Sequence, residues 1–264
     1  MNFLNIDEKT FLITGVSNKK SVAYFSAKNL LESGAKLIFT VQSSEHEQRV
    51  SKLFPDSDIF ILDVKNTSSM TELCNVLQEK KIRLSGILHS IAFANLTRMA
   101  PFHATSWEDF SEATQISSFS LVELTNALLP LLEVDASIVT ISISDTKATS
   151  YGYMGPIKAM LDATVSYLAK SLSENESTKF NRVNAVCAGP LKTSASAGIP
   201  GYIDSYIFAE KLTMRKKALA TAEVADTVTF LLSPRSSGIN ATGILVDAGM
   251  RSNHFDSSVV KGTN

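Results

Sequence analysis

The segment TFLITGVSNKKSVA, residues 10–23, points to the fold class of this chain. TFLIT is an apolar run of strand length, Gly15 follows it, and a helical pattern opens at Ser21. A serine immediately before a helical pattern is typical of a helix N-cap. A strand, a turn and a helix at the first junction of an α/β chain lie where doubly wound folds bind nucleotides. The segment therefore predicts a nucleotide-binding α/β fold.

The same alternation of strand-like and helix-like patterns continues through the 264 residues. Apolar runs predict strands at 10–14, 36–41, 58–62, 86–90, 137–142, 181–186 and 243–246. Amphipathic periodicity predicts helices at 21–33, 44–53, 68–78, 107–129, 156–172 and 221–232. Apolar strands that alternate with helices indicate a parallel sheet covered on both faces. We expect one Rossmann-type doubly wound domain over residues 1–264, with an irregular tail at 251–264.

Composition and charge exclude several function classes. The formal net charge of -1 gives no basic excess for a nucleic-acid partner. Cys74 and Cys187 lie in apolar surroundings without metal-ligand spacing, which predicts reduced thiols and no metal site. The polar start MNFLNIDEKT does not resemble a secretory signal, and no apolar run is long enough to span a membrane. We expect a cytoplasmic protein that has no membrane partner.

The turn after the first strand offers a site for a cofactor phosphate. Free amides and the helix dipole favour an anion at a helix N-terminus, and Gly15 lets the backbone approach it closely. Gly15, Ser21 and Val22 are the candidate residues. The usual G-x-G-x-x-G pattern is absent, because VSNKKS follows the single glycine. A plain strand–loop–helix connection capped by Ser21 is the alternative interpretation.

The ends of the second and third strands bear on the choice of dinucleotide. Gln42 follows the second strand, where an acidic residue would bind both ribose hydroxyls and a basic one would favour a 2′-phosphate. Since neither is present, the sequence favours NADH modestly and leaves NADPH open. Asp63 and Val64 end the third strand and are candidates for the adenine edge. For Asp63 an Asx turn before the next helix is an equal alternative.

Tyr151 and Lys158 are seven positions apart in YGYMGPIK and form the candidate catalytic pair. Seven residues are nearly two helical turns, so both groups can lie on one side of the chain. Pro156 predicts that the helix begins close to it, which leaves Tyr151 on the preceding loop. A nearby ammonium would favour an ionised or strongly polarised phenol. The alternatives are a surface tyrosine and a solvated helix lysine.

Several further motifs carry a family resemblance that extends over about residues 3–247. The chain resembles the divergent short-chain dehydrogenase/reductases that act as enoyl-acyl-carrier-protein reductases in bacterial fatty-acid synthesis. The similar motifs, in the family's order, are TGVSNKKSVA, FTVQ, ILDV, HSIAFA, YGYMGPIK, RVNAVCAGPLKTSASAGI and LVDAG. HSIAFA replaces the N-N-A-G of ordinary short-chain dehydrogenases, and the gap from tyrosine to lysine is longer. These two features together are specific to the divergent branch.

The resemblance implies a role for each matched residue. The dinucleotide path would be lined by Gly15, Ser21, Gln42, Asp63, Val64, Ser90, Ile91 and Ala92. Tyr151 would meet the substrate, Lys158 would hold the nicotinamide ribose, and a mobile substrate loop would span about 194–211. The nicotinamide carboxamide and diphosphate would be flanked by Pro190, Leu191 and Thr193. Further substrate contacts would come from Phe93, Ala94, Tyr153, Ala195 and Ile199.

The resemblance also implies an activity and an assembly. An NADH-dependent enzyme of this kind reduces the 2,3 double bond of an enoyl thioester that acyl carrier protein presents. A homotetramer is implied, with 107–129 and 156–172 at subunit faces. A carbonyl reductase in which Tyr151 protonates an alkoxide is one alternative. A nucleotide-binding paralogue without turnover is another.

Three departures from the family pattern bear on these alternatives. An upstream aromatic residue of the family is replaced here by Ile141 or Ile143. Ala92 stands where the family usually has glycine, which adds a methyl group near the nicotinamide. The stretch IPGYID in the substrate loop has no cation to meet an acidic carrier protein. Nearby candidates for a basic patch are Lys192, Lys211, Arg215, Lys216 and Lys217.

Overall fold

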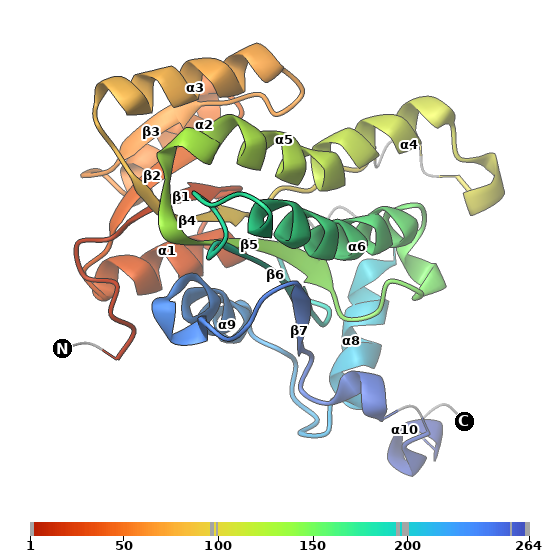
Figure 1. Ribbon diagram of the computed structural model, residues 1–264. Helices are drawn as coiled ribbons and strands as arrows, with labels where there is room; N and C mark the ends of the chain where they lie inside the picture. Colours follow the sequence, from red (N-terminus) through yellow and green to blue (C-terminus); the bar gives the residue numbers. More distant parts are fainter. Residues whose placement is uncertain are drawn as a thin grey trace.

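A seven-stranded sheet with the order β3-β2-β1-β4-β5-β6-β7 forms the centre of the molecule (Figure 1). This computed structural model describes residues 3–95, 98, 100–193, 196, 201–253 and 255–261. All neighbouring strands in the sheet are parallel. The strands are β1 Thr10–Thr14, β2 Lys36–Val41, β3 Asp58–Ile61, β4 Leu84–His89, β5 Leu132–Ile143, β6 Arg182–Ala188 and β7 Thr242–Val246. The prediction of one doubly wound α/β domain is confirmed.

Helices cover both faces of this sheet. Their bounds are α1 Val22–Glu32, α2 Ser44–Leu53, α3 Thr67–Glu79, α4 Trp107–Thr114, α5 Ser120–Leu128, α6 Met154–Ser173, α8 Tyr202–Leu212, α9 Thr221–Leu232 and α10 Ser257–Lys261. Side chains of α1, α2 and α9 share one hydrophobic core with the sheet, and side chains of α3, α5 and α6 share the other. Figure 1 shows α3 and α5 on one side of the strands and α1 and α9 on the other.

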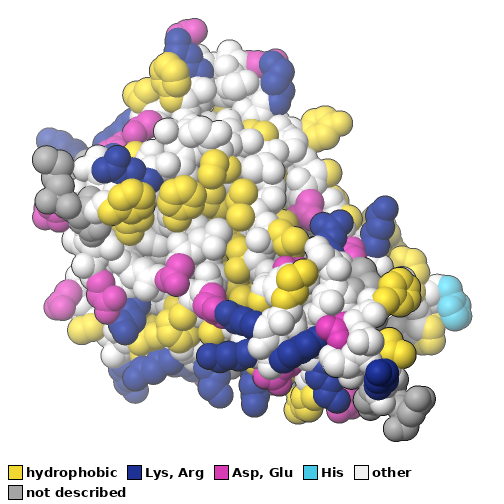
Figure 2. All heavy atoms as spheres, turned by 90° about the horizontal axis from the view of Figure 1, so that it is seen from below, with side chains coloured by type: hydrophobic (Ala, Val, Ile, Leu, Met, Phe, Trp, Pro, Cys, Tyr) yellow, Lys and Arg dark blue, Asp and Glu magenta, His cyan; other side chains and the backbone are white. Residues whose placement is uncertain are grey.

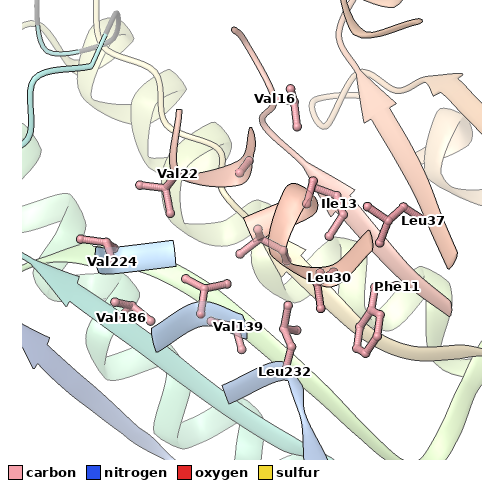
Figure 3. Packing of buried hydrophobic residues seen from close by; sticks show 14 of the residues in the cluster. Phe11, Ile13, Val16, Val22, Leu30, Leu37, Val139, Val186, Val224 and Leu232 are labelled. Carbon is pink, nitrogen blue, oxygen red and sulfur yellow. The ribbon is translucent and has the colours of Figure 1, made fainter. Parts of the chain in front are cut away.

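The central strands are apolar on both sides because both of their faces are covered. Phe11 and Ile13 of β1 point into the core beneath α1 and α9, where Figure 3 shows them beside Leu30 and Leu232. Leu12, between them, belongs to the opposite core. Burying side chains of this size contributes about 1.5–3 kcal/mol each, which favours this strand in the middle of the sheet.

The predicted helix at 107–129 is wrong in one respect, because a π-helical turn at Gln115–Phe119 divides it into α4 and α5. Two hydroxyl groups donate to carbonyls of the preceding turn: Thr114 Oγ1 to Phe110 at 2.7 Å and Ser120 Oγ to Ile116 at 2.7 Å. Such bonds compete with the backbone amides for the same carbonyls. The turn brings the Ser117 hydroxyl to the backbone of Phe93, in the segment that follows β4.

Two segments predicted to be irregular form helices. α8 occupies Tyr202–Leu212, within the range assigned to a substrate loop, and it begins after Gly201, whose φ is 71°. α10 occupies Ser257–Lys261 in the expected tail. Its start is fixed by Asp256, whose Oδ1 accepts from the Ser258 amide at 2.8 Å. Asp256 also pairs with Lys216 at 2.5 Å, which ties the tail to the segment after α8.

Candidate active site

The carboxyl ends of the parallel strands meet at one edge of the sheet, and the predicted cofactor residues follow these ends. Gly15 follows β1, Gln42 follows β2 and Ser90 follows β4. β1 pairs with β2 on one side and with β4 on the other, so the order of connections reverses there. Open α/β sheets bind ligands in the crevice at such a reversal.

Position 15 requires glycine, because the turn after β1 passes very close to the segment after β4. Its φ is +78°, and a Cβ atom at this position would lie 1.8 Å from the Ser90 carbonyl oxygen. Thr14 fixes the same junction, because its Oγ1 donates to the Leu88 carbonyl at 3.0 Å and accepts from the Ser90 amide at 3.0 Å. The turn after β1 therefore runs directly against the segment after β4.

The first turn of α1 presents amides to this edge. Ser21 is its N-cap, and its Oγ accepts from the Tyr24 amide at 3.2 Å. The first turn carries no acidic side chain that would repel a phosphate. Val22 is only 6% exposed, so its side chain belongs to the core and its backbone alone faces a ligand. The tight Gly15 turn and this helix start together fit a dinucleotide phosphate.

The ends of β2 and β3 form the predicted adenosine side of the edge. Gln42 is exposed and uncharged. Asp63 Oδ1 accepts from the Lys65 amide at 3.0 Å, which is the Asx turn that the sequence left as the alternative for this residue. Val64 is 7% exposed and packs in the core on the α3 side. The backbone of residues 63 and 64 is therefore what this strand end offers to an adenine ring.

Residues 90–95, after β4, are held in place by side chains of other elements. Ser117 Oγ, from the π-helical turn, accepts from the Phe93 amide at 2.8 Å and donates to the Phe93 carbonyl at 3.1 Å. The Asn95 amide donates to the Tyr153 hydroxyl at 2.7 Å, and Asn95 Nδ2 donates to Asp109 Oδ1 at 2.9 Å. The segment predicted to line the cofactor and substrate is thus fixed at both Phe93 and Asn95.

His89 anchors the same segment from β4. Its Nδ1 lies 2.9 Å from Thr140 Oγ1 of β5, and its Nε2 lies 2.8 Å from Ser120 Oγ of α5. Burial, with the positive charge of Lys158 as a smaller cause, lowers the pKa of His89 to about 3. The imidazole is therefore neutral at physiological pH and acts as a structural bridge.

Lys158 is buried near the start of α6, with 4% of its surface exposed. Its Nζ donates to the Ile141 carbonyl of β5 at 2.8 Å. Burial lowers the pKa of this ammonium to about 8, while the nearby Asp162 carboxylate opposes the shift. Asp162 is one helical turn further along α6, so it partly balances the buried charge.

Tyr151 ends a short helical turn, Thr149–Tyr151, ahead of α6. The prediction that α6 begins near Pro156 and leaves Tyr151 before it is confirmed, since α6 starts at Met154. Burial, and then the neighbouring Tyr202 phenol, raise the pKa of Tyr151 to about 12. The expected effect of Lys158 on the phenol is not seen, because burial and Tyr202 raise the pKa of Tyr151 and the Lys158 ammonium is bonded to the Ile141 carbonyl.

The loop after β6 carries the other predicted cofactor contacts. Pro190 is half-buried, and the backbone of Leu191 is bonded to the Tyr202 hydroxyl of α8 in both directions, at 2.9 and 2.8 Å. The Thr193 amide donates to Ser196 Oγ at 2.9 Å, and the Thr193 hydroxyl is 3.2 Å from the same oxygen. Thr193 is therefore already used to shape the loop.

The predicted substrate contacts are only partly together. Phe93 is 39% exposed, and Ala94 packs with Tyr151 in a small cluster beside α6. Tyr153 is 4% exposed, so the prediction that it meets the substrate is replaced by its bond to the Asn95 amide. The remaining predicted contacts, Ala195 and Ile199, lie outside the described residues.

A family model described as Enoyl-(Acyl carrier protein) reductase matches residues 15–251. The chain belongs to this family. It is 35% identical over 255 residues to the enoyl-acyl-carrier-protein reductase (NADH) FabI of a Nostoc species, covering 93% of this chain and 97% of that one. It is 33% identical over 254 residues to the enoyl-acyl-carrier-protein reductase (NADPH) FabI of Staphylococcus aureus, covering 93% and 98%.

Solved structures agree with this family assignment. The enoyl-acyl-carrier-protein reductase (NADH) of Aquifex aeolicus superposes with a TM-score of 0.87 at 34% identity, covering 93% of this chain and 97% of that one. The Anaplasma phagocytophilum enoyl-acyl-carrier-protein reductase in complex with NAD superposes with a TM-score of 0.89 at 28% identity, covering 97% and 98%.

Two residues of this reductase-family site were missed from the sequence. Asp162 had a readable signal, because a carboxylate four positions after Lys158 on a helix lies beside it. Tyr202 had a weaker signal, since Gly201 precedes it and YIDSYIFAEKL is compatible with a helix. Neither signal shows that the Tyr202 hydroxyl reaches back to Leu191.

Two positions at which the sequence departs from the family pattern can be located in the structure. Ile143 is the last residue of β5, where it pairs with Ala188, so no aromatic ring stands at this strand end. Ala92 is exposed beside the crevice.

Within the described ranges, no cluster of histidine, cysteine, aspartate and glutamate side chains could hold a metal ion. Among the helices of that same part of the chain, none has the length and apolar character to cross a membrane.

Proposed function

We propose that this chain is an NADH-dependent enoyl-acyl-carrier-protein reductase of fatty-acid synthesis, which reduces the 2,3 double bond of an enoyl thioester. One observation carries the proposal. Tyr151 ends the short turn before α6, and Lys158, in the first turns of α6, reaches the carboxyl end of β5. This is the edge at which Gly15 meets Ser90. These positions support a site in which a phenol and an ammonium flank a bound dinucleotide.

The role of Tyr151 follows from its protonation state. A bound nicotinamide supplies the hydride for C3 of the substrate, and negative charge then develops on the thioester oxygen. With a pKa of about 12, the Tyr151 phenol keeps its proton at neutral pH and acts as a hydrogen-bond donor. A donor aimed at that oxygen stabilises the transition state more than the ground state. Tyr151 is therefore the proposed catalytic residue.

Lys158 holds the ribose in this proposal. An ammonium has three N–H donors, and one of them is used by the Ile141 carbonyl at 2.8 Å. The remaining donors are free to bind ribose hydroxyls, while the bond to Ile141 fixes their direction. Burial makes this positioning stricter, because the side chain has little room to move.

The preference for NADH over NADPH remains a proposal about Gln42. A 2′-phosphate carries negative charge, and Gln42 supplies no cation to meet it. Relatives are named for each cofactor, NADH in Nostoc and NADPH in Staphylococcus aureus. A comparison of kcat/KM for the two cofactors tests this preference directly.

We propose that the substrate arrives on acyl carrier protein. This acidic partner would bind to a basic surface of the reductase, called here the landing surface. Two of the candidate cations are used inside the chain, because Arg215 pairs with Glu223 at 2.5 Å and Lys216 pairs with Asp256 at 2.5 Å. Exposed ion pairs of this kind contribute only about 0–1 kcal/mol, so an acidic partner can still compete for them.

The other three candidates, Lys192, Lys211 and Lys217, are exposed. They accompany exposed apolar residues of α8, where Ile203 and Ile207 are 66% and 45% exposed. Figure 2 shows cations and exposed hydrophobic side chains next to each other on the face seen from below. The proposed landing surface is therefore mixed, with an apolar part supplied by α8.

One assay tests the function. Purified protein is given NADH and a crotonyl thioester or a ketoacyl thioester, and the loss of the nicotinamide absorbance band is followed. Oxidation of NADH with the enoyl thioester alone is the expected result. Oxidation with the ketoacyl thioester alone would make the chain a carbonyl reductase, and cofactor binding without oxidation would make it a silent paralogue.

The proposed assembly and location rest on separate observations. α6 exposes Met160 and Tyr167, at 38% and 80%, and the π-helical turn exposes Phe119 at 45%. These residues lie in the two segments expected at subunit faces, which supports a homotetramer. Cys74 and Cys187 are free thiols, which supports a reducing cytoplasm as the proposed location.

A further inference from the structure

Tyr202, the first residue of α8, bonds through its hydroxyl to the backbone of Leu191, which follows β6. Its hydroxyl accepts from the Leu191 amide at 2.9 Å and donates to the Leu191 carbonyl at 2.8 Å. One side-chain oxygen therefore uses both backbone hydrogen-bonding groups of a single residue. Gly201, with φ 71°, makes the turn that lets α8 begin there.

Leu191 lies at the proposed nicotinamide end of the crevice. It follows β6, whose neighbour β5 carries the Ile141 carbonyl that binds Lys158. The Tyr202 phenol is close enough to Tyr151 to help raise the pKa of that phenol. Tyr202 and Leu191 are therefore next to the group that would meet the substrate.

A carboxamide has the same hydrogen-bonding requirement as the Tyr202 hydroxyl. Its NH₂ group donates and its carbonyl oxygen accepts, so one backbone carbonyl and one backbone amide satisfy it. Ser196 Oγ also donates to the Leu191 carbonyl, at 2.7 Å, so this carbonyl keeps a protein donor when the Tyr202 hydroxyl leaves it. The Tyr202 hydroxyl and a nicotinamide carboxamide therefore compete for the same pair of groups.

We propose that Tyr202 is a further residue of the nicotinamide pocket, whose hydroxyl must release Leu191 for the carboxamide to bind. This inference rests on the proposed function, because it needs a nicotinamide at this edge. Its consequence is that cofactor affinity and the position of α8 are coupled. When NADH binds, its carboxamide takes the place of the Tyr202 hydroxyl at Leu191. α8 then loses this contact and can adjust to the acyl chain.

The test compares two ligands and two matched variants by calorimetric or fluorescence titration. NADH carries the carboxamide, whereas ADP-ribose fills the rest of the dinucleotide path without it. Tyr202→Phe removes the competing hydroxyl and keeps the ring. We expect this variant to bind NADH roughly tenfold more tightly, about 1.4 kcal/mol, with unchanged affinity for ADP-ribose.

Tyr206→Phe is the matched control, since it makes the same chemical change one turn later on α8 and should leave both affinities unchanged. Unchanged or weaker NADH binding by Tyr202→Phe would overturn the inference, and so would an equal change for both ligands. If wild-type protein reduces the enoyl thioester while Tyr202→Phe has wild-type affinity, only this inference fails. If wild-type protein does not bind NADH, the proposed function fails with it.

Discussion

At the scale of single residues, Tyr151 shows how burial sets a chemical role. A phenol with a pKa of about 12 is a poor base at neutral pH and a persistent hydrogen-bond donor. The structure thus favours stabilisation of a developing oxyanion over proton abstraction. The Ile143 position, which lacks an aromatic ring, leaves Tyr151 and Tyr202 as the neighbouring phenols of this edge.

Replacing Tyr151 by phenylalanine should lower kcat by roughly 10²- to 10³-fold, the usual cost of one oxyanion donor. The Kd of NADH should stay within about twofold, because the hydroxyl acts on the substrate oxygen. Stopped-flow turnover and NADH titration measure the two quantities. Tyr167→Phe, on the exposed side of α6, serves as a control with wild-type kcat. A wild-type kcat in Tyr151→Phe would remove Tyr151 from the mechanism.

Lys158 predicts a pH dependence of cofactor binding. Burial lowers its pKa from 10.5 to about 8, so the ammonium is lost as pH rises through this value. The Kd of NADH should therefore rise roughly tenfold from about pH 7 to about pH 9. Lys158→Met should bind weakly and without this dependence. A wild-type profile that stays flat over this range would contradict the role.

The same shift has the opposite sign for stability. Above about pH 8 the folded protein binds fewer protons at Lys158 than the unfolded chain, whose pKa stays near 10.5. The Lys158 contribution to the free energy of unfolding therefore increases as pH rises between these values. Cofactor affinity and stability should thus change in opposite directions over that range.

At the scale of elements, residues 89–95 depend on groups from β5, α5, the π-helical turn and the N-cap of α6. Tyr153→Phe removes the acceptor of the Asn95 amide and keeps the buried ring. Losing this bond should cost about 1 kcal/mol of stability. We expect KM for the enoyl thioester to rise several-fold while kcat changes less. Thermal unfolding and steady-state kinetics measure these effects, and an unchanged KM would limit Tyr153 to a packing role.

Element positions could be predicted well wherever one pattern dominated. The bounds of β1, β2, α2 and α9 agree with the sequence, because their apolar residues follow a single period and their ends carry caps or turns. α8 was missed because Ile203, Ile207 and Phe208 stay exposed and give no stripe toward the core. The π-helical turn was missed because the bond from Ser117 to Phe93, a residue of another segment, cannot be read from QISSF.

The candidate site divides in the same way. Gly15 and Ser21 could be predicted because local chemistry restricts a tight turn and a cap, whereas Lys158 was identified through the family resemblance. The contacts of Tyr153 and Tyr202 could not, since their hydroxyls bond to backbone groups of Asn95 and Leu191 in other segments. Sequence motifs identified which residues gather at the edge, and tertiary packing decided what each one touches.

At the scale of the whole molecule, the exposed apolar residues of α6 predict an assembly. In a symmetric tetramer each substitution is repeated in every copy, so one charge at an interface has a multiplied effect. Tyr167→Glu should shift the mass of the 28.6 kDa chain from a tetramer toward smaller species in light scattering. Gln48→Glu, at an exposed position of α2 outside the expected subunit faces, is a control for one added charge. A mass unaffected by Tyr167→Glu would place the interface elsewhere.

The π-helical turn also bears on how this enzyme scaffold can change length. Five residues there, Gln115–Phe119, occupy a wider coil than an ordinary helix would form. A one-residue deletion within it would leave a regular helix in which α4 keeps its orientation, because the wider coil holds the extra residue in about one turn. The helix would survive, yet Ser117 would no longer face Phe93. A chain shortened here would therefore fold and yet lose the contact that holds Phe93 beside the proposed site.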